Sequence, residues 1–127
     1  MSDSSIPLPA SRLFAVLLVA STVACSESKP AGGGAQNSGA ALFQKNGCAT
    51  CHSADGRGTA LGPKLVGVAV HWKRDTLVEY LKDPQAYAAK DARLAAQGKQ
   101  YMMPMTKFGM LPREQLAALA DHVLALR

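Results

Sequence analysis

The sequence predicts a small all-α domain of three to five short helices joined by long loops. The segment 112–127, PREQLAALADHVLALR, carries apolar side chains at the i, i+3, i+4 and i+7 spacing of one helix face. The segment 53–70, SADGRGTALGPKLVGVAV, is instead interrupted by glycines and a proline, which is typical of a loop. No segment shows the sustained apolar–polar alternation of a half-buried strand.

The first 24 residues are typical of an export signal. Arg12 precedes the apolar run LFAVLLVASTVA, from Leu13 to Ala24. This run is shorter than the roughly 20 apolar residues that a membrane-spanning helix needs. A positive residue, an apolar stretch and then small residues is the order found in secretory signal peptides. We therefore expect residues 1–24 to be removed during export.

Cys25 follows the small residues of STVAC, a sequence that resembles the bacterial lipobox, in which the cysteine is acylated. The alternative is ordinary cleavage nearby, which would leave Cys25 as a free thiol. We expect acylation, because an odd cysteine in an exported chain otherwise lacks a partner. This predicts a lipid-anchored protein on the periplasmic side of a bacterial membrane, and Ser26 resembles the residue that sorts such proteins to the outer membrane. Without acylation the protein would be soluble outside the cytoplasm.

Residues 26–38, SESKPAGGGAQNS, carry no large apolar side chain, so they cannot repay the entropy of ordering. We assign residues 25–37 to the acylated cysteine and a flexible tether, and residues 38–127 to the folded domain. The net charge of +5 suits an acidic protein partner. Nucleic acid is not expected as a partner, since the positive charges are scattered singly and the protein is exported. We expect a monomer.

Three helices are predicted before the final one. Ser38 can cap the first helix, GAALFQKN, which Gly47 ends. The second, RDTLVEYLKD, has Asp75 or Thr76 as its cap, with Glu79 completing a capping box, and it ends at residues 83–84, Asp-Pro. The third, PQAYAAKDARLAAQ, is closed by Gly98.

A methionine-rich loop, KQYMMPMTKFGM, separates the third predicted helix from the last one. Pro112 suits the first position of that last helix, because its missing N–H has no partner there in any case.

The fragment NGCATCHSADG brings Cys48, Cys51 and His52 together. A thioredoxin-like dithiol would follow a strand, and none is predicted there. A structural zinc site would need four ligands. A disulfide between the two cysteines would close a trivial loop, and coincidence is the remaining alternative. C-x-x-C-H is the attachment signature of c-type haem: two thiols add to the porphyrin vinyl groups and the histidine binds the iron. The sequence therefore predicts one covalent haem c.

An electron carrier also needs the second face of the iron filled, and a thioether ligand favours the ferrous form. Four methionines lie in or beside the methionine-rich loop: Met102, Met103, Met105 and Met110. Methionine is also a common filler of cores, and we expect at least two of the four to have that role.

Residues 38–127 resemble class I c-type cytochromes, in particular small bacterial monohaem proteins. The resemblance is carried by CATCH, LGPKLVGV, LVEYLKDP, MPMTKF and the final LPREQLAALADHVLAL helix. It implies the small cytochrome c fold, wrapped around one covalent haem. It implies that Met103, which precedes a proline, is the second axial ligand beside His52, with Met102 and Met105 as alternatives and Met110 a poor one. It also implies that the Pro63 carbonyl accepts the ring N–H of His52.

The sequence departs from this family at one position. The family packs an aromatic residue of its last helix against Gly39 and Phe43, and His122 stands there in this chain. We expect His122 to fill the slot as a flat ring rather than to bind iron. His71 is another candidate for the second axial ligand of the iron and ranks below the methionines. Residues 72–74, Trp-Lys-Arg, could bind the haem propionates, or Lys73 and Arg74 could lie in a solvated loop.

The resemblance implies a single-electron carrier, not an enzyme, that shuttles between redox proteins with acidic docking faces. Three alternatives are a dedicated haem subunit of a dehydrogenase or terminal oxidase, a haem sensor or peroxidase-like protein with a labile sixth ligand, and a non-haem dithiol oxidoreductase.

Overall fold

The computed structural model describes residues 34–127, and the expected signal segment, Cys25 and residues 26–33 of the expected tether lie outside the described residues. Within residues 34–127 the structure is helical and has no strand, which confirms the all-α class. The elements are η1 (Ala35–Asn37), α1 (Gly39–Lys45), α2 (Cys48–His52), η2 (Val68–Val70), α3 (Arg74–Lys82), α4 (Pro84–Ala88), α5 (Ala92–Gly98) and α6 (Arg113–Ala125).

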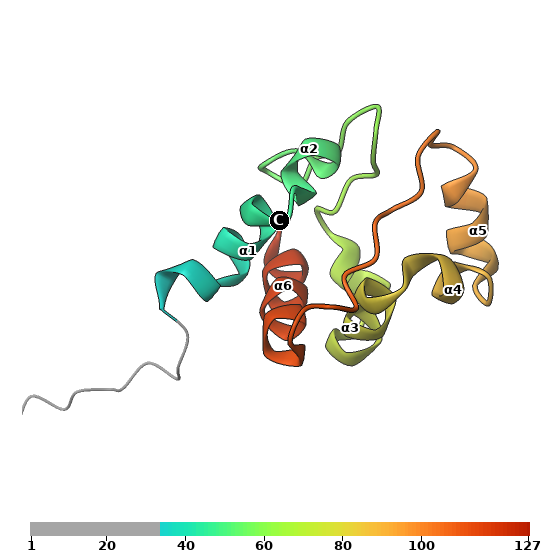
Figure 1. The fold of residues 1–127 in the computed structure, drawn as a ribbon. Helices are drawn as coiled ribbons and strands as arrows, with labels where there is room; N and C mark the ends of the chain where they lie inside the picture. Colours follow the sequence, from blue (N-terminus) through green and yellow to red (C-terminus); the bar gives the residue numbers. More distant parts are fainter. Residues whose placement is uncertain (1–33) are drawn as a thin grey trace, which may run out of the picture.

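Figure 1 shows α1, α2 and α6 on one side and α4 and α5 on the other, with the loop after α5 running between them. Helix α3 connects the two sides, because it packs against both α6 and α4. The buried core lies where α1, α3 and α6 meet. Its members are Leu42, Phe43, Leu77, Val78, Leu81, Leu116, Leu119, Ala120 and Val123.

The contact between α1 and α6 depends on Gly39. A Cβ built on this residue would overlap the Ala118 carbonyl oxygen and lie 2.6 Å from the His122 Cβ. The backbones can approach this closely only because Gly39 has no side chain. One turn further along α1, the ring of Phe43 meets the ring of His122 edge-on, at a centroid distance of 5.2 Å. His122 therefore fills the predicted slot between the first and last helices.

The first residues of the first and last helices agree with the sequence analysis to within one residue. The Ser38 side chain accepts a hydrogen bond from Ala41 N at 3.2 Å and caps α1 as predicted. Helix α6 begins at Arg113, with Pro112 as its N-cap rather than its first residue.

The predicted cap of α3 is wrong, because the helix begins before both candidates. Lys73 is the N-cap, and Thr76 is the third helical residue, whose hydroxyl donates to the Lys73 carbonyl at 2.9 Å. Glu79 is not part of a capping box: it pairs with Lys82 at 2.7 Å and with Arg113 at 3.5 Å.

The helix predicted over residues 84–97 is divided into α4 and α5. Asp91 has an extended backbone, and its carboxylate accepts from Arg93 N and Leu94 N at 2.9 and 3.1 Å. It therefore starts a new helix. This division, and the helical form of the CATCH segment, raise the number of α-helices in the described part of the chain to six, above the expected three to five. None of the helices described is long and apolar enough to cross a membrane.

We predict that Gly39→Ala lowers the free energy of unfolding by about 1–3 kcal/mol, the range found for overpacked cores, because the added methyl group separates α1 from α6. Urea denaturation of the holoprotein measures this change.

Gly98→Ala is the matched control, since Gly98 also lies in a helix and nothing lies within 4 Å of a Cβ built there. We expect this variant to be at least as stable as the parent, because alanine is the better helix former. Equal losses in the two variants would contradict the close approach at Gly39.

Candidate functional site

Helix α2 presents the three residues of the cysteine–histidine motif together. It follows α1 after a sharp turn at Gly47, whose φ of +73° is a left-handed conformation that favours glycine. Positions three and four residues apart lie on one face of a helix, so Cys48, Cys51 and His52 are neighbours. Both cysteines are free thiols and half-buried. Burial raises the pKa of the Cys48 thiol.

His52 is the buried polar residue of this site, with 6% of its surface exposed. Its Nδ1 lies 2.8 Å from the Pro63 carbonyl oxygen. A carbonyl can only accept, so Nδ1 carries the hydrogen and donates, and Nε2 keeps its lone pair for another partner. The contact that the resemblance implied between Pro63 and His52 is therefore present, and it fixes both the tautomer and the ring orientation.

The segment 53–67, named here the proximal loop, holds Pro63 in place by folding back onto α2. Gly58 N donates to the His52 carbonyl at 2.9 Å, and the Thr59 hydroxyl donates to the Cys51 carbonyl at 2.7 Å. Gly62 approaches so closely that a Cβ there would lie 2.9 Å from the Cys51 carbonyl oxygen. The loop and the helix thus form one unit around the histidine.

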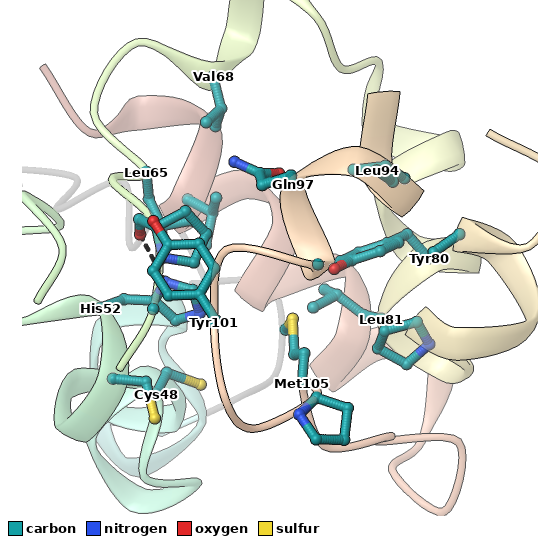
Figure 2. A pocket seen from close by; sticks show the side chains of 18 of the residues that line it. Cys48, His52, Leu65, Val68, Tyr80, Leu81, Leu94, Gln97, Tyr101 and Met105 are labelled. Atoms are coloured by element: carbon teal, nitrogen blue, oxygen red, sulfur yellow. Dashed lines mark hydrogen bonds between the residues drawn. The ribbon is translucent and has the colours of Figure 1, made fainter. Parts of the chain in front are cut away.

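A cavity of about 1010 Å³ opens beside this unit. That volume is at the upper end of the range for small-molecule and cofactor sites, about 300–1,000 Å³. Figure 2 shows side chains from both sides of the molecule converging on it. Its lining includes Cys48, Cys51, His52, Leu65, Val68, Trp72, Tyr80, Leu81, Arg93, Leu94, Gln97, Tyr101 and Met105.

The four candidate methionines differ in their burial. Met102, Met103 and Met110 have 101%, 67% and 92% of their surface exposed. Met105 is partly buried and packs against the core. Figure 2 shows its side chain reaching into the cavity from the methionine-rich loop. The geometry therefore favours Met105 over Met103 as the residue that faces His52.

Phe108 ties the chain to the core three residues after Met105. Its backbone N donates to the Leu81 carbonyl at 2.9 Å, and its ring packs against the core.

The structure places some of the other predicted site residues at the cavity and the others away from it. Trp72 lines the cavity, whereas Lys73 and Arg74 do not. The Arg74 guanidinium instead forms a two-pronged ion pair with Asp121 on α6, at 2.6 and 3.0 Å. Of the two alternatives for Lys73 and Arg74, the structure therefore favours the solvated one, since both residues are exposed. His71 is exposed and lines the cavity rim, while His122 packs on Phe43 outside it.

Arg93 and Tyr80 are site residues that the sequence analysis missed. The Arg93 guanidinium lies 5.5 Å from the centre of the Trp72 ring, and the Tyr80 ring lies 5.0 Å from it. Burial raises the pKa of Tyr80, so its hydroxyl remains a hydrogen-bond donor. Together these residues form an edge of the cavity that can receive a carboxylate. Arg93 reaches it because Asp91 redirects the chain, which no periodicity indicates.

Among residues 34–127, no group of three or more His, Cys, Asp or Glu side chains is placed to hold a metal ion. The zinc alternative for Cys48, Cys51 and His52 therefore has no further ligands in this part of the chain.

Residues 36–127 match the family model described as Cytochrome c. No curated protein and no solved structure matches the chain.

We predict that Thr59→Val lowers the free energy of unfolding by about 1 kcal/mol, because the Thr59 hydroxyl donates to the Cys51 carbonyl and accepts from Leu61 N at 3.0 Å. Chemical denaturation of the holoprotein provides the measurement.

Thr50→Val is the control, since Thr50 is an exposed residue of α2. Its replacement should change stability by no more than about 0.5 kcal/mol. If both variants lose the same stability, the loop is not tied to α2 through Thr59.

Proposed function

Since the chain belongs to the cytochrome c family, whose members bind haem c covalently, we propose that it is a single-electron carrier that shuttles between redox proteins. The observation that carries this proposal is His52. Its Nδ1 is committed to Pro63, its Nε2 is available beside the cavity, and a thioether reaches into the cavity from another part of the chain.

The residues present fit a haem. Cys48 and Cys51 would form the thioether links, and His52 and a methionine would bind the iron from opposite sides. When bound, the haem supplies a one-electron couple at its iron. The chain would supply ligands from the two walls of the cavity, and apolar side chains such as Leu65, Val68 and Leu81 line it. A centre with both axial positions filled changes oxidation state with little movement, which suits a carrier.

We propose Met105, in place of Met103, as the sixth ligand. Its partial burial and its position inside the cavity support this choice, whereas Met103 is two-thirds exposed. Three residues after Met105, the backbone N of Phe108 donates a hydrogen bond to the Leu81 carbonyl, and this limits the movement of the methionine-rich loop. A thioether held in this way gives the iron a soft ligand and favours its ferrous form.

The partner we propose is a redox protein with an acidic docking face. Lys64 lines the cavity, and exposed apolar side chains at its rim include Leu61 and Met103. The net charge of +5 adds a general attraction. Encounters steered in this way are fast, transient and weakened by salt.

We also propose that Cys25 is acylated and that residues 25–37 tether the domain to the periplasmic side of a bacterial membrane. Cytochrome c domains are typically extracytoplasmic, which supports the export signal over residues 1–24. Anchoring would keep the domain near its donor and acceptor and raise their effective concentration.

We predict that Met105→Ala abolishes the long-wavelength ferric absorption band of methionine-sulfur ligation and lowers the reduction potential, because the soft ligand is lost. In the ferrous state this variant should bind carbon monoxide readily, whereas the parent should resist it. Optical spectra of the full-length holoprotein in both oxidation states, recorded with and without carbon monoxide, measure all three changes.

Met103→Ala is the control and should behave as the parent does. The reverse result would return the ligand assignment to Met103. A parent protein that binds carbon monoxide at once would contradict the carrier function and favour a sensor or peroxidase-like protein.

We predict that Cys25→Ser moves the protein from the membrane fraction to the soluble fraction and leaves the haem spectrum unchanged, since Cys25 is not one of the haem-attachment residues. Ser28→Ala is the control and should stay with the membrane. Fractionation and mass spectrometry of the mature N-terminus provide the readout, and a soluble parent would exclude the lipid anchor.

A further inference from the structure

Both ends of the proximal loop are held by one residue, Leu126, which follows the last turn of α6. At the far end, Gly67 N donates to the Leu126 carbonyl at 3.2 Å. At the near end, the Leu126 side chain covers Gly56 so closely that a Cβ built there would lie 2.6 Å from Leu126 Cδ1. Figure 1 shows the C-terminal end of α6 beside α2 and the loop.

Gly56 passes this constraint on to the segment around Pro63. It is buried, with a left-handed φ of +71°, and its carbonyl accepts from Leu65 N at 2.7 Å and Val66 N at 3.1 Å. These two donors lie two and three residues after Pro63. A shift of Gly56 would therefore move the Pro63 carbonyl, which accepts the ring N–H of His52.

Leu126 is itself fixed. Its backbone N donates to the Val123 carbonyl at 3.3 Å, and there the chain leaves the helix for an extended conformation, with φ −65° and ψ 125°. This places its carbonyl and its side chain on two different points of the loop.

We propose that Leu126 is a positioning residue for the His52–Pro63 hydrogen bond and that it thereby tunes the reduction potential. The proposal rests on the proposed function, in which His52 binds the iron. A hydrogen bond from the outer nitrogen of a ligating histidine makes the ring a more basic ligand, which favours the ferric state. Loosening the loop weakens that bond, so the potential rises.

The test uses the full-length holoprotein with Leu126→Ala, and Leu126→Val as a milder truncation in case the first variant folds poorly. We expect a positive shift in reduction potential that is larger for alanine than for valine. We also expect the His52 Nδ1–H to exchange with solvent about tenfold faster by proton NMR, because local opening becomes easier. Leu126→Met, which keeps the volume of the side chain, should restore both values.

Leu124→Ala is the matched control, because Leu124 packs against the core from the same end of α6. It should lower the stability while leaving the potential and the exchange of the His52 proton unchanged. If Leu124→Ala moves both readouts as far as Leu126→Ala does, or if neither Leu126 variant moves them, the proposal is overturned.

A failure of the proposed function would look different. A parent protein without covalent haem, or with an iron that His52 does not bind, would have the wrong spectrum before any substitution was made at Leu126.

Discussion

The hydrogen bond from His52 to Pro63 is the interaction on which the site depends. It decides which ring nitrogen carries the hydrogen, and so which one is left to bind a metal. The histidine sits at the end of a helix little more than one turn long, which could not orient a ring by itself. The proximal loop supplies the missing constraint, through Thr59 and Gly62 packed on the backbone of Cys51. A long loop rich in glycine thus supplies the contacts that orient the histidine.

The domain consists of two halves that form opposite walls of the cavity. Helices α1 and α6, joined closely at Gly39, form the support beneath the cysteine–histidine motif. Helices α3 to α5 and the methionine-rich loop form the opposite wall. Most of the cavity lies between these halves, which explains why a domain this small leaves so large an apolar volume beside its core. A bound cofactor that fills the space would serve as part of the core, as small domains often require.

What the sequence predicted well was local. The spacing of Cys48, Cys51 and His52, the Ser38 cap and the apolar stripe of the last helix each depend on residues within a few positions of one another. The sequence left open or missed the features that depend on a distant contact or on burial. Arg74 pairs with Asp121 on another helix, and the four methionines differ in burial in a way that the sequence does not reveal. The sequence pattern places Asp91 inside a helix. In the structure its carboxylate instead caps the next helix, an alternative that the pattern does not reveal.

The segments that carry His52 and Met105 lie about fifty residues apart along the chain, and this separation has an entropic consequence. A metal bound by both His52 and Met105 would act as a cross-link and would close a loop that contains α3, α4 and α5. Like a disulfide, such a cross-link would reduce the number of conformations available to the unfolded chain. The group that carries the electron would therefore also stabilise the fold as a cross-link. Without the methionine ligand, the methionine-rich loop would be released, while the thioether links would keep the porphyrin attached.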